Sequence, residues 1–344
     1  MSITTHPLLA VVIPNRNGMR HLTYSLDCLA DTTYQPRTTI MVDNCSSDES
    51  RRFVSDKHPL IAIEKNPRDL GFAGSVNVGI RWARAQRADY VAVYSNDIRV
   101  PEEVFEPAIA FMERHPDVAI VGYTELRRSE ISMIAMPSAV HYSEVGPMLP
   151  GMLYLCRTTA LDTVGDYDDF YYMYGEEVDL FSRLVRAGYR IVKTNVPVWH
   201  YVSGTSKVVR FGVAWYSYRN EIRFALKCGR ARQILQRLLA VLYYATASNP
   251  RPRRHSGAST AGRSDASTGV DSAEAIREYR VHLERFRPGN TVLNLALYLA
   301  TLFWNLIFLP HTLRGRFRDS QRVAQHVAVH RPQAGGTPLK SAAE

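Results

Sequence analysis

Short apolar runs separated by helical patterns dominate the first 123 residues of the chain. The run LLAVVI at 8–13 shows no polar alternation, which is typical of a strand buried on both faces. Such runs predict strands at 8–13, 38–42, 61–64, 90–94 and 118–123, and helical spacing predicts helices at 21–30, 71–86 and 102–114. Strands that alternate with helices in this way indicate βαβ units, so we expect an α/β fold with a mainly parallel sheet and flanking helices.

A denser pattern begins at residue 165. Apolar residues recur at helical spacing from Glu177, Gly188 predicts the end of that helix, and a short strand is expected near 191–192 with His200 after it. Glu176 and Glu177 thus lie at a helix N-terminus, where the helix dipole favours negative charge. A capped surface helix would explain this pair alone. The segment, however, crowds carboxylates beside aromatic rings: Asp166, Asp168, Asp169, Glu176, Glu177 and Asp179, with Phe170, Tyr171, Tyr172 and Tyr174.

Polar side chains follow four of the predicted strands. Ligands of such sheets bind outside the carboxyl ends of the strands, so these polar groups are expected to converge on one crevice. An Asp after the second strand can accept hydrogen bonds from a base or ribose, and an Asp after the fourth can hold a divalent cation, which prefers carboxylate oxygens. Neither GxGxxG after the first strand nor GxxxxGK[ST] occurs, which argues against dinucleotide and P-loop sites. The polar sets are Asn15, Arg16 and Asn17; Asp43 and Asn44; Asn66 and Asp69; and Asn96 and Asp97.

The charge of the chain is distributed unevenly. The 344 residues carry a net charge of +9, but residues 1–229 hold 25 Lys and Arg against 26 Asp and Glu, whereas residues 230–344 hold 17 against 7. A basic C-terminal part suits an anionic membrane or a nucleic acid. The four cysteines form no CxxC pair, and no basic region precedes the first apolar run, so we expect a reducing, cytoplasmic location without a signal peptide.

The C-terminal part also contains a long uncharged segment at 290–310. Its length would suffice for a bilayer span. Five polar residues share one helical face, which favours an amphipathic helix that lies in a membrane or packs on another helix: Thr291, Asn294, Tyr298, Thr301 and Asn305. Arginines on both sides can meet anionic headgroups, and because they flank apolar helices we expect no nucleic-acid partner. A spanning helix and an oligomer interface remain alternatives.

Six collinear segments over residues 8–206 resemble family 2 glycosyltransferases of the GT-A fold, in the bacterial branch that includes rhamnosyl- and galactofuranosyltransferases. The segments are VVIPNRNG (11–18), MVDNCSSDES (41–50), NPRDLGFAGSVNVGI (66–80), VAVYSNDIRV (91–100), PGMLYLCRTTALDTVGDYDDFYYMYGEEVDLFSRLVRAGYR (150–190) and WHYVSGTS (199–206). A further segment at 216–224 resembles a YxxRNxxxF pattern of the same branch. The resemblance implies sugar transfer from a nucleotide-diphosphate donor with inversion, aided by Mg²⁺ or Mn²⁺.

The resemblance also assigns roles to residues. Glu177, with Glu176 as a substitute, takes the place of the catalytic base, and Asp97 and His200 take the places of metal-binding residues. Two departures matter: the metal motif, Ser95-Asn96-Asp97, has one carboxylate, and Glu177 is one methylene longer than the family's Asp, a shift of roughly 1.5 Å. The expected nucleotide-sugar site comprises Pro14, Asn15, Asn17, Asp43, Asn44, Asn66, Gly71, Asn77 and Asn96.

Three aromatic residues, Tyr172, Tyr174 and Trp199, are candidate sugar- or acceptor-binding rings, although core packing would explain them as well. His200 has the same alternative, and Asp179 is expected to anchor the helix. We expect a GT-A domain at 1–229, an amphipathic helix at 230–248, a disordered linker at 249–272, a helical membrane-associating or oligomerisation region at 273–320 and a disordered tail at 321–344.

The expected function is therefore sugar transfer to a lipid-linked or polysaccharide acceptor of the cell envelope, by an enzyme attached peripherally to the inner face of the cell membrane. A soluble acceptor, with the tail serving oligomerisation, is one alternative. A non-catalytic nucleotide-sugar-binding or scaffold protein of the same fold is another, because of the single carboxylate at 95–97 and the Glu that replaces the expected Asp.

Overall fold

The computed structural model describes residues 6–126, 134–201, 210–246 and 291–329. Its strands are β1 (Leu9–Asn15), β2 (Arg37–Asp43), β3 (Ala62–Lys65), β4 (Tyr90–Tyr94), β5 (Ile98–Arg99), β6 (Val118–Leu126), β7 (Tyr142–Val145), β8 (Leu153–Arg157) and β9 (Arg190–His200). Its helices are α1 (Met19–Ala30), α2 (Ser50–Lys57), α3 (Gly71–Ala85), α4 (Glu106–Arg114), α5 (Thr158–Val164), the 3-10 turn η1 (Asp169–Tyr171), α6 (Glu176–Arg186), α7 (Arg210–Cys228), α8 (Ala231–Thr246), α10 (Thr291–Ile307) and α11 (Leu309–Val329).

The strands form one sheet in the order β3-β2-β1-β4-β8-β6-β9-β5, with β7 paired to β9. The first four strands are parallel, as the alternation of strands and helices predicts. Beyond them the sheet is mixed, because β8 runs antiparallel to both of its neighbours, β4 and β6. The α/β fold class is therefore confirmed, and the parallel arrangement is confined to the N-terminal half and the β6–β9 pair.

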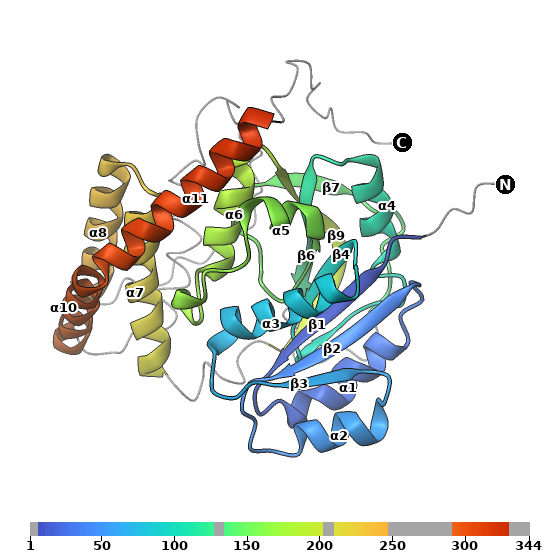
Figure 1. Ribbon diagram of the computed structural model, residues 1–344. Coiled ribbons are helices and arrows are strands. Elements are labelled where there is room, and N and C mark those ends of the chain that lie inside the picture. Colours follow the sequence, from blue (N-terminus) through green and yellow to red (C-terminus); the bar gives the residue numbers. More distant parts are fainter. Residues whose placement is uncertain (1–5, 127–133, 202–209, 247–290, 330–344) are drawn as a thin grey trace.

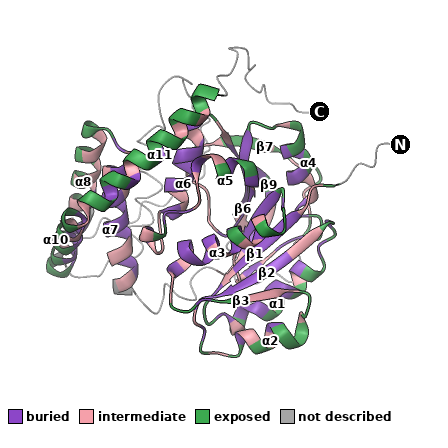
Figure 2. Cartoon of the chain, viewed as in Figure 1, coloured by how far each residue is buried: buried purple, intermediate pink, exposed green. Residues whose placement is uncertain are grey.

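Alternate residues of the central strands pack against helices on opposite faces of the sheet, as the two-residue period of a strand requires. Leu9, Val11 and Ile13 of β1 face α1, α2 and α4, whereas Ala10 and Val12 face α3, α5 and α6. Both faces are covered in Figures 1 and 2, and the central strands are buried throughout. Full coverage explains why the apolar runs of these strands show no polar alternation.

Four helices form a second body beside α6, with a small apolar core of their own between α7, α8 and α10. The predicted boundary at 229 therefore lies between two packed helices, α7 and α8. The predicted tail from 321 is wrong at its start, because α11 continues as a helix to Val329. The predicted linker at 249–272 lies outside the described residues.

The uncharged segment forms α10, and its polar stripe faces inward. The side chains of Asn294, Thr301 and Asn305 have no exposed surface, whereas Val292 is 76% exposed and Phe303 66% exposed. The helix is thus polar toward α7 and apolar toward the outside, the reverse of an ordinary surface helix. Among the described helices, none is by itself long and apolar enough to cross a membrane, whereas 292–307 and 309–329 together meet that criterion as a pair bent by 64°.

Candidate functional site

The carboxyl ends of β1, β2 and β4 bring the predicted polar sets together. Asn96, after β4, donates a hydrogen bond from Nδ2 to Oδ1 of Asn15 at the end of β1 (2.7 Å), and Asn15 donates to Ser46 Oγ (3.2 Å). A Cβ on Gly18 would lie within 2.2 Å of both Asn15 and Asn96, so only glycine fits there. The convergence expected from the sequence is therefore present at this edge.

Asp43, the last residue of β2, is a buried carboxylate to which no described residue donates a hydrogen bond. Its side chain has no exposed surface, and within the described part of the chain neither oxygen accepts a hydrogen bond. Arg51 Nε lies 3.3 Å from Oδ2 and offsets the charge. A buried carboxylate ordinarily has hydrogen-bond donors around it. Asp43 is therefore suited to accept hydrogen bonds from a ligand at this edge.

The asparagine amides of the expected nucleotide site mostly bond to the protein itself. Asn66 Nδ2 donates to Asn44 Oδ1 (3.0 Å) and Ser75 Oγ (3.1 Å). Asn77 pairs with the backbone of Tyr167 in both directions (2.9 and 3.0 Å). The amide groups of Asn66 and Asn77 therefore shape the crevice, and the predicted direct contact with a nucleotide stays a prediction for them.

Pro14 and Asn17 also line this edge. Pro14 lies in β1 opposite Val42 of β2 and is partly exposed. Asn17 adopts a left-handed backbone (φ 51°), and its Oδ1 accepts a hydrogen bond from Ser47 N (2.8 Å). These contacts fix the loop after β1 against the loop after β2.

Asp69 joins the crevice to residues 166–179, which we call the acidic segment. The sequence did not assign this connection. It accepts hydrogen bonds from Asn44 Nδ2 (2.7 Å), Tyr172 Oη (2.7 Å) and the backbone N–H of Gly71 (2.9 Å), and Arg16 forms an ion pair with it. Gly71 has φ 68°, and a Cβ there would clash with Tyr172 O at 2.4 Å. Gly71 is therefore required by close packing against Tyr172.

Asp97 and His200, the predicted metal-binding pair, lie together. His200 Nε2 is 3.3 Å from Asp97 Oδ1, and Nδ1 is 2.7 Å from Glu125 Oε1. Burial alone would lower the pKa of His200, but hydrogen bonds to Asp97 and Glu125 outweigh burial and raise the pKa to about 9. A carboxylate and an imidazole at one point are donors that a divalent cation accepts when substrate phosphates and water supply the rest. No three His, Cys, Asp or Glu side chains of the described residues form a metal-binding group.

Glu176 and Glu177 open α6, and their neighbouring carboxyl groups influence each other's pKa. Burial and the neighbouring charge of Glu177 raise the pKa of Glu176 well above that of an ordinary glutamate. Burial raises the pKa of Glu177, while the hydrogen bond from Glu176 opposes that rise. Glu176 therefore holds a proton more firmly, and Glu177, the more exposed of the two, is the member that can take a proton from a ligand.

The Glu pair is adjacent to the loop of Asp97. A Cβ on Gly151 would lie 2.4 Å from Glu177 Oε1, so the carboxylate rests on the backbone at Gly151. The next residue, Met152, accepts a hydrogen bond from Ser95 N (2.9 Å), two residues before Asp97. The candidate base and the candidate cation site therefore flank the same strand end.

The three candidate sugar-binding rings differ in their surroundings. Tyr172 stacks on Tyr216 of α7 (centroids 4.8 Å apart) and is half-buried, and Tyr174 is half-buried next to the Glu pair, with burial raising its pKa to about 12. Trp199 is only 8% exposed and packs edge-on against Tyr24 of α1. Core packing, the alternative left open for these rings, therefore describes Trp199, whose ring belongs to the packing of α1 on β9.

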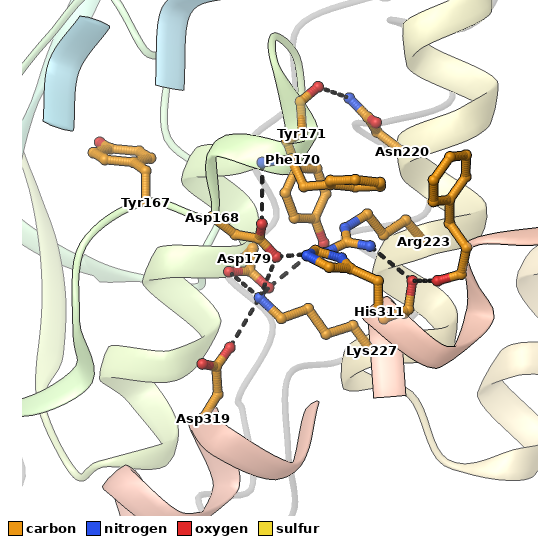
Figure 3. A network of polar contacts seen from close by, with 12 residues as sticks. Tyr167, Asp168, Phe170, Tyr171, Asp179, Asn220, Arg223, Lys227, His311 and Asp319 are labelled. Atoms are coloured by element: carbon orange, nitrogen blue, oxygen red, sulfur yellow. Dashed lines mark hydrogen bonds and ion pairs between the residues drawn. The ribbon is translucent and has the colours of Figure 1, made fainter. Parts of the chain in front are cut away.

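The acidic segment is tied to the C-terminal helices by a buried charge cluster of three acids and three bases, of which Figure 3 shows all but Arg183. Lys227 Nζ of α7 contacts Asp168, Asp179 and Asp319 at 2.8–2.9 Å. The acids are Asp168, Asp179 and Asp319, and the bases are Arg183, Arg223 and Lys227. Burial alone would raise the pKa of Asp168, but the charges of Lys227 and Arg223 lower it below that of an ordinary aspartate. Asp179 therefore anchors α6, as predicted.

Two hollows of the described surface contain neither Glu177 nor Asp97. One, about 540 Å³, lies between α5 and α11 at Arg84 and Arg322, and the other, about 310 Å³, lies at Asp69 and Arg81. The second borders the crevice through Asp69.

Comparison with known proteins supports the fold and the family. Residues 10–153 match the family model "Glycosyl transferase family 2". Galactofuranosyltransferase GlfT1 of Mycobacterium tuberculosis is 28% identical over 203 residues, which cover 54% of this chain and 66% of that protein, so the match spans slightly less than two thirds of the relative. The N-acetylglucosaminyl-diphospho-decaprenol L-rhamnosyltransferase of the same species is 24% identical over 221 residues, covering 53% of this chain and 72% of that protein.

Solved structures agree in fold. TarS 1-349 of S. aureus in complex with UDP superposes with a TM-score of 0.52 at 14% identity, covering 97% of this chain and 94% of that one. The mannosyltransferase PcManGT from Pyrobaculum calidifontis, in complex with GDP-Man and Mn²⁺, gives a TM-score of 0.51 at 15% identity, covering 94% and 88%. The mixed α/β sheet therefore matches the GT-A fold of these structures, and residues 10–153 carry the similarity to glycosyl transferase family 2.

Proposed function

We propose that this chain is an inverting glycosyltransferase that moves a sugar from a nucleoside diphosphate donor to a hydroxyl of a lipid-linked saccharide. The observation that carries the proposal is the position of the Glu176–Glu177 pair at the start of α6, beside the loop of Asp97. A displacement of this kind needs one base for the acceptor proton and stabilisation of the leaving diphosphate. Glu177 is suited to the first requirement, and Asp97, whose loop lies at the same strand end, is suited to the second.

In the proposed reaction, Glu177 accepts the proton of the acceptor hydroxyl as its oxygen bonds to the anomeric carbon. The bond from that carbon to the diphosphate oxygen breaks on the opposite face, which inverts the centre. Protonated Glu176 beside it favours the ionised form of Glu177 and opposes the effect of burial. Asp43 accepts hydrogen bonds from the base or ribose of the donor.

A divalent cation, Mg²⁺ or Mn²⁺, fits the donor set of Asp97 and His200, with substrate phosphate oxygens as further ligands. When bound, such a cation neutralises the charge that develops on the diphosphate. The mannosyltransferase of the same fold was solved with Mn²⁺ and a nucleotide sugar.

Calorimetry with UDP, dTDP and GDP, each with and without Mn²⁺, tests the donor site. We expect one diphosphate to bind in a metal-dependent manner, with the metal dependence lost in Asp97→Ala and the affinity lowered in Asp43→Asn. The control is Asp56→Asn, an exposed carboxylate of α2 paired with Arg52, which should bind as the wild type does. Binding that ignores Mn²⁺ would remove the role of Asp97, and no binding at all would favour the non-catalytic alternative.

The proposed acceptor and location rest on the outer face of the helical body. We define the apolar outer face as the exposed large apolar residues of α8 and α10: Leu235, Leu239, Tyr243, Val292, Leu293, Leu299, Phe303, Leu306 and Ile307. An apolar surface of this extent marks an interaction site. The exposed Arg314 and Arg318 of α11 follow directly in sequence and suit anionic headgroups. We therefore infer peripheral attachment to the inner face of the cell membrane, which also places a lipid-linked acceptor within reach.

Flotation with vesicles of anionic phospholipid tests this attachment. Wild-type protein should float with the vesicles, and Phe303→Ser combined with Leu306→Ser should stay in solution, because both changes remove apolar area from the outer face. Leu60→Ser is the matched control, since Leu60 is 95% exposed but lies between α2 and β3. Oligomers that persist without vesicles and dissociate in the double variant would indicate that a second copy covers this face.

A further inference from the structure

We propose that Arg219 and Asn220 of α7 are positioning residues that hold the 170–175 loop in the conformation that presents Glu176 and Glu177. The proposal rests on the proposed function, because it explains how that function's base is positioned. Both side chains are buried, and neither touches Asp43, Asp97 or His200 in the described contacts.

The backbone that leads into the Glu pair is conformationally demanding. Tyr172 (φ 65°), Tyr174 (φ 69°) and Gly175 (φ 87°) all lie in the left-handed region. Side chains other than glycine rarely adopt this region, and such residues persist where the surroundings determine their conformation. Two strained tyrosines directly before a candidate base therefore require a structural support.

Asn220 supplies that support from the middle of α7. Its Nδ2 donates to the backbone carbonyls of Tyr171 (2.9 Å), Met173 (2.8 Å) and Tyr174 (2.7 Å). The residue is 1% exposed, so water does not compete for these carbonyls. One amide group thus binds three backbone carbonyls of the same loop. Figure 3 shows Asn220 reaching the backbone at Tyr171 from α7.

Arg219 fixes the orientation of that amide. Its Nε donates to Asn220 Oδ1 (2.8 Å), which leaves Nδ2 as the group that faces the loop, and its Nη2 donates to the carbonyl of Phe170 (3.0 Å). The guanidinium lies over the rings of Tyr216 and Trp304, 4.7 and 4.6 Å from their centroids. The arginine is thus held on both sides by aromatic rings.

The inward polar stripe of α10 supports α7 at Arg219. Asn305 Nδ2 donates to the carbonyl of Arg219 (2.9 Å) and has no exposed surface. The buried charge cluster holds the two ends of the acidic segment at Asp168 and Asp179, whereas Arg219 and Asn220 hold its middle. The last carbonyl that Asn220 binds belongs to Tyr174, the residue before Gly175 and the Glu pair.

The test compares Asn220→Asp and Asn220→Gln. Asp has the size of Asn but replaces the donor with a carboxylate that faces three carbonyls, whereas Gln keeps the donor on a longer side chain. Asn195→Asp is the matched control, because Asn195 also holds a loop backbone, at Ala139 and His141, but in the middle of β9 beside the start of β7. The probes are UDP-galactofuranose and dTDP-rhamnose with N-acetylglucosaminyl diphosphodecaprenol in detergent, with nucleoside diphosphate release as the measure of turnover.

We expect Asn220→Asp to lower kcat by about 10²-fold, the loss that a displacement of roughly 1 Å in a reacting group can produce. The dissociation constant of the bound diphosphate should stay at the wild-type value, and Asn220→Gln should recover part of kcat. Backbone amide exchange at 171–175 should rise in Asn220→Asp and not in Asn195→Asp. A merely structural role would instead lower diphosphate affinity and the melting temperature together with kcat.

Failure of this inference differs from failure of the proposed function. A folded Asn220→Asp protein with wild-type kcat, or with unchanged amide exchange at 171–175, overturns the positioning role while the wild-type turnover stands. If the wild type releases no diphosphate from either donor, the proposed function fails with these substrates, and the exchange measurement still decides whether Asn220 holds the loop.

Discussion

The strand-end crevice and the acidic segment are held together by different means. Around Asn15, Asn44 and Asn66, neutral amides bond to one another across loops that the parallel sheet already brings close. Around Asp168 and Asp179, buried charges and a strained backbone are held by helices that lie about 50 residues or more further along the chain. We call the strand-end crevice the donor side and the acidic segment with its Glu pair the base side. The donor side thus follows from the sheet, whereas the base side depends on the C-terminal helices α7, α8, α10 and α11.

Substitution of the candidate base should separate the two regions most strongly. Glu177→Gln keeps the size of the side chain and removes its proton acceptor, so kcat should fall by about 10²–10⁴-fold, the usual contribution of a general base. Diphosphate binding should persist, because the crevice is unchanged. The control Glu144→Gln alters an exposed carboxylate on β7 that pairs with Arg190. Wild-type turnover in Glu177→Gln would assign the base to another residue.

Loss of Lys227 should destabilise the base side. Lys227→Met leaves Asp168, Asp179 and Asp319 with too little positive charge, and breaking a buried ion pair in this way costs about 3–5 kcal/mol of unfolding free energy. Urea unfolding followed by circular dichroism measures the loss. Arg190→Met, which breaks a more exposed pair with Asp117, should cost about 1 kcal/mol or less. Equal losses in the two variants would contradict the contrast between the regions.

Acid should weaken the buried charge cluster. The loss in the free energy of unfolding should be smaller near neutral pH than at low pH. Because Lys227 and Arg223 lower the folded-state pKa of Asp168, its stabilising contribution is present above the ordinary pKa of 3.8 and is lost as pH falls through the lower folded value. The free energy of unfolding, measured in urea from pH 7 downward, should therefore decline below about pH 4. Asp168→Asn should show a shallower decline. An identical pH dependence in both proteins would mean that other groups govern the acid response.

The sequence predicted the donor side better than the base side. Apolar runs place the strands, and the strand ends then place Asn15, Asp43 and Asn96 at one edge without further information. The sequence does not reveal that β8 inserts antiparallel beside β4, because LYLCR at 153–157 has the same apolar character as a parallel strand. Pattern identifies a strand, and only the connections set its direction.

Two points that the sequence left open share a physical cause. Periodicity shows which residues of 290–310 share a helical face, but not which face is buried, so the inward orientation of Asn305 could not be foreseen. Trp199 in turn alternates correctly along β9, yet its burial depends on Tyr24 of α1, which is distant in sequence. The role of Asn220 likewise depends on contacts 46–49 residues away.

The position of Asp319 has a consequence for the order in which the protein assembles during synthesis. The parallel strands and their helices lie within the first 94 residues and can pair as they leave the ribosome, as domains generally do. The charge cluster under α6, by contrast, has one carboxylate too few until the chain has been made past residue 319. The helix that carries Glu176 and Glu177 is therefore completed late, and a newly made chain forms its parallel strands before the Glu pair is held in place.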